Sequence, residues 1–171
     1  MTKQELIESF SKNHQELIDF VNSLTNENFT FSYSGKWTAG QQLNHVYLTI
    51  IPFTKVLLSK EYIIQKFGII DRPTWDYNTV IENYSKTSLK APPQYLPDET
   101  LSEQKEKIIA DMQTTVLRIQ SLLNQYTEEE LDSLVLPHPL LGHLTIREMF
   151  YLMSYHPLHH LKQTKQNLSI Y

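Results

Sequence analysis

The chain of 171 residues contains no cysteine and only four glycines. Without cysteine it cannot form disulfides, use a CxxC redox pair or bind zinc through thiolates, so any metal site must be built from histidine and carboxylate. The scarcity of glycine argues against a sheet-rich fold with many tight turns. Neither GxGxxG nor GxxxxGK[ST] occurs, which excludes nucleotide binding through those loops.

An excess of positive charge is also absent. The formal net charge is -4, whereas nucleic-acid-binding domains carry a basic face, so we expect no nucleic-acid partner. The charged N-terminus has no apolar h-region and does not resemble a signal peptide. The most apolar run, from Val46 to Phe53, is far shorter than the ~18 residues that suggest a membrane span. We therefore expect a cytoplasmic protein without membrane contact.

Apolar residues recur at three- and four-residue steps in four long segments, which is the period of an amphipathic helix. These segments are residues 2–24, 38–58, 98–125 and 145–167. A threonine followed three residues later by Glu or Gln, the capping-box pattern, opens the first, second and fourth of them. The same pattern at Thr127 predicts a short extra helix before the last one. The sequence therefore predicts an all-α four-helix bundle, formed as a single domain by residues 1–171.

Proline interrupts this pattern. Pro52 and Pro157 lie inside predicted helices and should kink them, because proline lacks an N–H and clashes with the carbonyl four residues earlier. Residues 137–139 should form an exposed turn, which makes His138 and His143 loop residues. His14 lies on the apolar stripe of the first helix and is predicted to be a core residue.

Residues 61–97 contain four prolines and no sustained periodicity. They predict a long crossover between the second and third helices, with a short helix around residues 78–85. A connection of this length is uncommon in a compact domain and is often functional, so we expect it to cover one end of the bundle. The predicted wall residues of a pocket beneath it are Trp75, Asp76 and Tyr77.

Three of the seven histidines lie within five residues near the C-terminus. Two of them, His156 and His160, are four positions apart and share one face of a helix, about 5–6 Å between Cβ atoms. His45 lies seven residues after the threonine that caps its helix, and His156 lies eleven after its own. Both offsets are close to whole turns. The two side chains should therefore point into the core at similar depth, which makes His45 the predicted third metal ligand.

Three histidines with an open fourth position are the arrangement of catalytic zinc. Imidazole also suits nickel, copper and iron, and we expect a divalent cation, zinc or nickel first. No G-x-S-x-G motif or catalytic cysteine offers another nucleophile.

The motifs W-T-x-x-Q-x-x-x-H from Trp37, T-x-x-E from Thr145 and H-x-x-H-H-x-x-Q from His156 resemble those of the DinB/YfiT superfamily of four-helix-bundle metalloproteins. The resemblance covers nearly the whole chain. It implies a divalent metal held by one histidine of the second helix and a pair from the last, with His159 pointing elsewhere. The residues that match the ligands are His45, His156 and His160. Gln163, which matches the glutamine of the motif, and Gln41, one turn before His45, are expected to contact the ligands.

Relatives in this superfamily include S-transferases that use low-molecular-weight thiols such as bacillithiol or mycothiol. The resemblance therefore implies a metal-dependent thiol S-transferase that acts on small electrophilic substrates. A hydrolase that activates water at the same metal is the alternative, with Asp71 or Asp76 as its base. A non-enzymatic metal-binding or scaffold protein is the third hypothesis, and a homodimer is compatible with all three.

Overall fold

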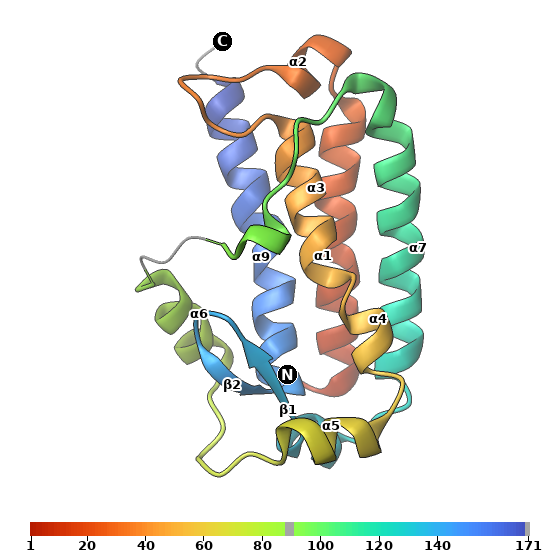
Figure 1. Cartoon of the computed structure of the whole chain (residues 1–171), viewed down its shortest axis with the longest axis vertical. Coiled ribbons are helices and arrows are strands. Elements are labelled where there is room, and N and C mark those ends of the chain that lie inside the picture. Colours follow the sequence, from red (N-terminus) through yellow and green to blue (C-terminus); the bar gives the residue numbers. More distant parts are fainter. Residues whose placement is uncertain (88–90, 170–171) are drawn as a thin grey trace.

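The computed structural model describes residues 1–87 and 91–169; residues 88–90 of the predicted crossover and 170–171 lie outside the described residues. Four long helices lie side by side (Figure 1): α1 (Lys3–Ser23), α3 (Ala39–Ile50), α7 (Lys105–Leu123) and α9 (Ile146–Leu168). Helix α1 packs against α9, α7 and α3, and α3 packs against α9 and α7. The predicted four-helix bundle is confirmed.

The apolar stripes seen in the sequence form the core of the bundle. Each of the four long helices buries one face, and their buried side chains belong to one hydrophobic cluster. Among the least exposed are Leu6, Phe10, Leu17, Leu43, Val46, Met112, Ile119 and Phe150. The core therefore lies along the axis shared by helices far apart in the sequence.

The predicted capping boxes are present at the starts of α1, α3, α8 (Glu128–Ser133) and α9. In each, the threonine hydroxyl accepts a bond from a backbone N–H of the first turn, and the Glu or Gln side chain accepts one from the threonine N–H. The predicted start of the third helix at residue 98 was wrong. A turn of 3-10 helix, η2 (Ser102–Gln104), comes first. Leu101 lies before the first residue of α7, Lys105, and is 52% exposed. It therefore does not belong to the buried apolar face of that helix.

Proline has different effects in two helices. Helix α3 ends at Ile50, and the separate short helix α4 (Phe53–Val56) follows Pro52, which confirms the predicted interruption. Helix α9 runs through Pro157 without ending. Asn13 of α1 donates to the carbonyl of Ser154 at 2.8 Å, one position after the carbonyl that Pro157 deprives of its helical donor. Packing on α1 thus supports the helix at its weakest point.

The crossover contains α5 (Lys60–Phe67), α6 (Tyr77–Ser85) and η1 (Pro93–Tyr95), and α2 (Asn26–Thr30) lies between α1 and α3. Helix α6 confirms the predicted short helix. In Figure 1 the crossover runs from the lower end of the bundle, where α5 lies, past α6 to η1 beside α3. It therefore covers one side of the bundle as well as one end.

The predicted exposed turn at residues 137–139 belongs to a β-hairpin. Strands β1 (Val135–His138) and β2 (Gly142–Thr145) are antiparallel and pair His138 with Gly142. The loop turns at Gly142, whose φ of 72° suits glycine. Each strand has only four residues, and β1 contains Pro137, so neither shows a clear alternation in the sequence. Because Leu136 and Leu144 are buried against the bundle, tertiary packing holds the hairpin in place.

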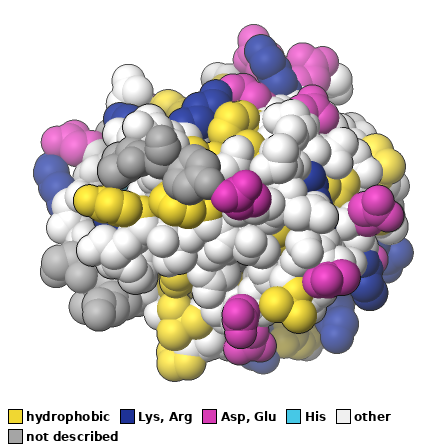
Figure 2. All heavy atoms as spheres, turned by 90° about the horizontal axis from the view of Figure 1, so that it is seen from above, with side chains coloured by type: hydrophobic (Ala, Val, Ile, Leu, Met, Phe, Trp, Pro, Cys, Tyr) yellow, Lys and Arg dark blue, Asp and Glu magenta, His cyan; other side chains and the backbone are white. Residues whose placement is uncertain are grey.

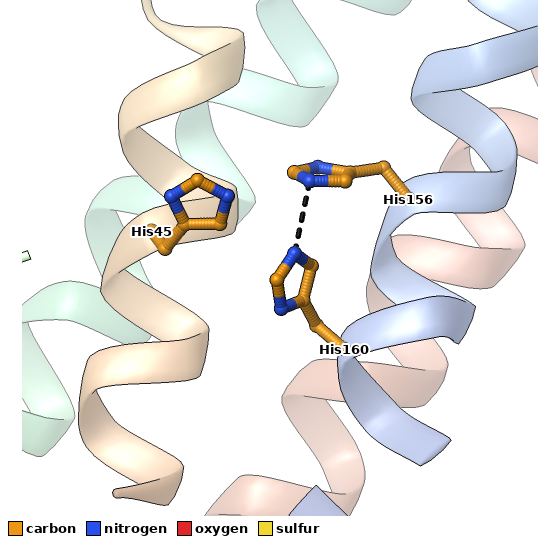
Figure 3. A group of neighbouring side chains, drawn as sticks. All are labelled: His45, His156 and His160. Atoms are coloured by element: carbon orange, nitrogen blue, oxygen red, sulfur yellow. Dashed lines mark hydrogen bonds between the residues drawn. The ribbon is translucent and has the colours of Figure 1, made fainter. Parts of the chain in front are cut away.

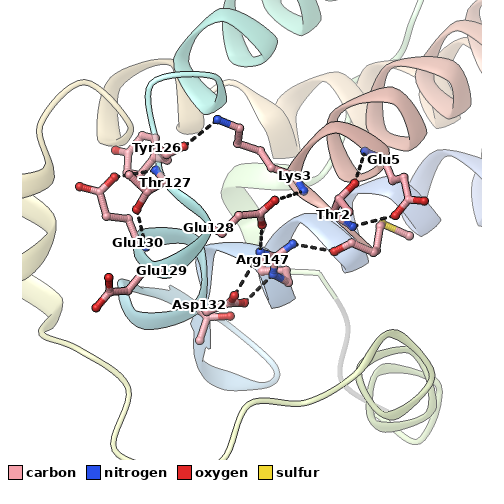
Figure 4. A network of polar contacts seen from close by, with 12 residues as sticks. Thr2, Lys3, Glu5, Tyr126, Thr127, Glu128, Glu129, Glu130, Asp132 and Arg147 are labelled. Atoms are coloured by element: carbon pink, nitrogen blue, oxygen red, sulfur yellow. Dashed lines mark hydrogen bonds and ion pairs between the residues drawn. The ribbon is translucent and has the colours of Figure 1, made fainter.

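Polar contacts tie the first turn of α9 to distant parts of the chain (Figure 4). Arg147 donates to Glu128, to Asp132 and to the carbonyl of Met1. Lys3 at the start of α1 donates its backbone N–H to the other oxygen of Glu128, at 2.8 Å. The N-terminus, α8 and α9 are therefore joined at one end of the bundle.

No helix among residues 1–87 and 91–169 combines the length and apolar character needed to cross a membrane. On the face seen in Figure 2, acidic and basic side chains are interspersed, and neither sign gathers into one patch.

His14 is a buried core residue, as predicted. Its ring lies 4.2 Å from that of Phe10, its Nδ1 donates to the Phe10 carbonyl at 2.7 Å, and its buried Nε2 has no partner. Burial lowers the pKa of His14 to about 4, while the bond to the Phe10 carbonyl opposes this shift. Between about pH 4 and pH 6.5, the folded protein therefore keeps this imidazole neutral, whereas the unfolded chain would protonate it.

This shift in pKa determines how the free energy of unfolding changes with pH. A pKa that is lower in the folded than in the unfolded state stabilises the fold above about pH 6.5, and this stability is lost as the pH falls toward 4. We expect His14→Leu to reduce the difference in unfolding free energy between pH 7.5 and pH 5 by about 2 kcal/mol. Urea titrations of the metal-free protein measure it. The same pH dependence in parent and variant would contradict the prediction.

Candidate metal centre

His45, His156 and His160 converge in the core between α3 and α9 (Figure 3), and all three are buried. One ring nitrogen from each lies within 4.8 Å of the others. The Nε2 atoms of His156 and His160 are 2.9 Å apart. The structure thus brings together the three residues that the turn count and the resemblance selected.

The other nitrogen of each ring faces a partner from α3 or from the crossover. Nδ1 of His45 lies 2.6 Å from the carbonyl of Tyr95, which can only accept a hydrogen bond. Nδ1 of His160 lies against the amide oxygen of Gln42. These contacts place a proton on Nδ1 of both rings and leave Nε2 unprotonated.

Nδ1 of His156 also faces a protein oxygen, the hydroxyl of Thr49. The Thr49 hydroxyl donates to the carbonyl of Val46 at 2.7 Å and lies 3.4 Å from Nδ1 of His156. Since the hydroxyl proton is used, its oxygen is free to accept from Nδ1. In this tautomer all three rings direct an Nε2 lone pair at one point. In the other tautomer, His156 donates its Nε2 proton to Nε2 of His160, the contact drawn in Figure 3.

Burial lowers the pKa values of His156 and His160 well below the ordinary value, and the proximity of the other imidazoles lowers them further. Burial also lowers the pKa of His45, while its bond to the Tyr95 carbonyl opposes the shift. Neutral imidazole is the form that binds metal. The site is therefore ready for a cation without first losing protons at neutral pH.

A divalent cation fits this donor set. Two Nε2 atoms at 2.9 Å are held together either by a proton on one of them or by a cation that both bind. Zinc–nitrogen bonds of about 2.0–2.1 Å place two ligand nitrogens of a tetrahedral ion roughly 3.3 Å apart. Small side-chain shifts reach that separation. Ligating histidines generally donate their second N–H to a carbonyl or carboxylate, as these rings do to protein oxygens.

A cavity of about 350 Å³ opens beside the site and is lined by His45 and His156. One wall is apolar and includes Phe53, Met149, Leu152 and Met153. The crossover supplies Tyr84, Thr87 and Tyr95, and the hairpin supplies His138. None of the described residues that line this cavity is an Asp, Glu, Lys or Arg. A small uncharged molecule can therefore lie next to His45 and His156.

Several predicted neighbours of the site lie elsewhere. The amide nitrogen of Gln163 contacts Nε2 of His159 at 2.9 Å, because a step of four residues along α9 pairs it with His159. The amide oxygen of Gln41 accepts from the backbone N–H of Thr38 at 3.0 Å. Gln41 is therefore used in the capping box, and the predictions for both glutamines were wrong.

The glutamine that contacts a candidate ligand is Gln42, the residue after Gln41. Its side chain faces His160, and the residue is 3% exposed. The sequence offered one signal for it: Gln42 lies three positions before His45, on the buried face of the same helix.

The predicted wall residues Trp75, Asp76 and Tyr77 do not line the cavity beside the triad. Trp75 and Asp76 border a second cavity of about 370 Å³ near Arg147 and Glu148. The carboxylate of Asp76 caps α6 by accepting from the N–H of Thr79 at 2.8 Å, and Tyr77 packs on Tyr151. Asp76 therefore cannot serve as a base at the triad. Asp71 is exposed and does not line the cavity either.

Gln42→Leu tests the partner of His160. We expect the affinity for zinc to fall by about 10- to 100-fold, because the His160 ring loses the acceptor that orients it. Competition with a chromogenic zinc chelator measures the affinity. Gln163→Leu is the matched control and should bind zinc like the parent. Equal losses in both variants would contradict the assignment of Gln42.

Comparison with known proteins supplies the family. A sequence model of the DinB superfamily matches residues 9–164. Among solved structures, YfiT from Bacillus subtilis matches with a TM-score of 0.60 at 18% identity, covering 98% of this chain and 87% of YfiT. It is described as a probable metal-dependent hydrolase with an unusual four-helix bundle topology. No curated protein matches the chain.

At this level of identity, the likeness to YfiT shows a common fold. The family match is the stronger finding, because it extends from α1 to the last turns of α9 and includes all three converging histidines. It agrees with the resemblance carried by the motifs at Trp37, Thr145 and His156. The chain belongs to the DinB superfamily.

Proposed function

We propose that this protein is a metal-dependent hydrolase that acts on a small uncharged substrate in the cavity beside His45, His156 and His160. One observation carries the proposal: three buried imidazoles bring one ring nitrogen each within 4.8 Å of the others, and no fourth ligand joins them among the described residues. That is the donor set of a catalytic zinc site with one position left for water or substrate. YfiT, which shares the fold, is itself described as a probable metal-dependent hydrolase.

A bound zinc or nickel ion would act as a Lewis acid and lower the pKa of a water or thiol at its open position. The protein supplies the orientation. Gln42, Thr49 and the Tyr95 carbonyl hold the three rings with Nε2 inward. The apolar wall of the cavity excludes water from one side and receives an apolar part of the substrate. Hydrolysis needs no further cofactor.

Thiol S-transfer is the second candidate, and one observation favours it. No described carboxylate lines the cavity, so a general base for water is not in place, whereas a thiol that binds a metal loses its proton outright. A low-molecular-weight thiol such as bacillithiol would then attack an electrophilic substrate. The uncharged lining suits the electrophile better than it suits a charged thiol.

The test combines metal analysis with two assays. Elemental analysis of the purified protein should find zinc or nickel at about one ion per chain. The zinc-loaded protein should hydrolyse 4-nitrophenyl acetate in thiol-free buffer, and His156→Ala should abolish this activity. His143→Ala, which removes an exposed histidine of β2, should retain it. Turnover of 1-chloro-2,4-dinitrobenzene only when bacillithiol is added would favour the transferase instead. Bound metal without either activity would overturn both and leave a metal-binding scaffold.

A further inference from the structure

His138 lies at the end of β1, and its Nδ1 is occupied by the backbone of the hairpin loop. The N–H groups of Leu140 and Leu141 both donate to this nitrogen, each at 3.2 Å. An imidazole nitrogen that accepts two hydrogen bonds must carry its lone pair. The proton of the neutral ring is therefore on Nε2.

The ring of His138 lines the same cavity as the histidine triad. Tyr84 lies between them, with its ring centre 6.4 Å from that of His138 and 6.5 Å from that of His156. Burial lowers the pKa of His138 to about 4. The ring therefore stays neutral at physiological pH and keeps its Nε2 proton.

We propose that the Nε2–H of His138 is a fixed hydrogen-bond donor that binds the acceptor atom of an uncharged substrate, a carbonyl compound with an apolar body. This inference rests on the proposed function for what happens to the substrate after it binds. The binding itself does not depend on that reaction. Tyr and Thr hydroxyls in the lining can rotate and either donate or accept. The backbone bonds at Nδ1 allow His138 only to donate.

The lining explains why the substrate is uncharged. Among the described residues that surround the cavity, none is a lysine, arginine, aspartate or glutamate. Against this lining, away from a cation at the triad, a carboxylate would lose its hydration without gaining an ionic partner, which is costly. A carbonyl group loses less hydration on entering the cavity, and it gains a hydrogen bond from His138. Phe53, Leu152 and Met153 receive the apolar body.

The first experiment measures the tautomer. Long-range 1H–15N spectra of the metal-free protein distinguish a protonated from an unprotonated ring nitrogen. The signals of His138, identified by their loss in His138→Asn, should show a proton on Nε2 and none on Nδ1. A proton on Nδ1 would overturn the proposal.

The second experiment measures binding of acetophenone, an uncharged carbonyl compound, to the metal-free protein by calorimetry. His138→Asn keeps an acceptor that can bond the loop N–H groups, as asparagine does in turns, but its shorter amide places no N–H at the position of Nε2. We expect it to bind acetophenone roughly 3- to 10-fold more weakly than the parent. His138→Gln, which carries an amide N–H near the Nε2 position, should recover part of the loss. His143→Asn, from the same hairpin but outside the cavity, should bind like the parent.

Benzoate, the charged counterpart, should not bind measurably. Equal acetophenone affinities of parent and His138→Asn, absence of saturable binding, or benzoate binding as tight as acetophenone would each overturn the proposal. Acetophenone is not hydrolysed. A failure of ester hydrolysis with the acetophenone difference intact would therefore reject the proposed reaction alone, and the reverse result would reject the donor alone.

Discussion

Replacing His160 with alanine is expected to lower the affinity for zinc by more than 100-fold, beyond the ~10- to 100-fold that loss of an outer hydrogen-bond partner costs. The variant keeps His45 and His156 but loses one of three converging Nε2 atoms. Zinc at about 1,000 times its dissociation constant stabilises a protein by about 4 kcal/mol. For a chain of this length that corresponds to a rise in melting temperature of roughly 10 °C. At the same zinc concentration a 100-fold loss of affinity leaves about 1.4 kcal/mol of this stabilisation. The rise in His160→Ala should therefore be no more than about a third of that in the parent.

His159→Ala is the matched control for this prediction. His159 is adjacent on α9, is half-buried and lies edge-on to the His160 ring, but its Nε2 contacts Gln163 and no nitrogen of its ring belongs to the converging group. Its substitution should leave both the zinc affinity and the zinc-induced rise in melting temperature intact. Calorimetric melting with and without zinc measures the effect. A rise of the same size in His160→Ala and in the parent would show that the three histidines do not act as one site.

Glu148→Ala is expected to destabilise the fold by about 3 kcal/mol, the lower end of the range for breaking a buried ion pair. The Glu148 side chain is 1% exposed and pairs with Arg72, whose side chain is 25% exposed and therefore recovers part of its hydration. The carboxylate also accepts from the backbone N–H of Trp75 at 2.5 Å and of Thr145 at 2.8 Å. Its loss leaves these donors without an acceptor in a buried place.

Urea unfolding of the metal-free protein measures this cost. Glu5→Ala is the control, because Glu5 has the same role in the capping box of α1 but is exposed and has no arginine partner. Its unfolding midpoint should change far less. Similar midpoints for the two variants would mean that Glu148 acts only as a helix cap and does not anchor the crossover.

Local patterns were enough to predict the starts of the helices that open with a capping box. A threonine with Glu or Gln three residues later satisfies backbone groups within one turn, so the capping boxes at Thr2, Thr38 and Thr145 depend on few distant contacts. The helical period then determines which side chains share a face. This is why counting turns from two capping threonines was sufficient to pair His45 with His156.

The same count could not identify the neighbours of the triad. Gln163 and Gln41 both lie one turn from a candidate ligand, yet each bonds a different group. The rotation of α3 against α9 decides that Gln42 faces His160. This rotation depends on how the two helices pack, and neither helix encodes it alone.

The sequence by itself therefore determined the bundle, the starts of its three capped long helices and the residues of the histidine triad, because each follows from a pattern within a few turns of a helix. Only the tertiary structure decided three features: the Tyr95 carbonyl behind His45, the hairpin that carries His138, and a cavity whose described lining residues include no Asp, Glu, Lys or Arg. These features join segments tens of residues apart. Their positions result from packing over the whole bundle, which no local pattern records.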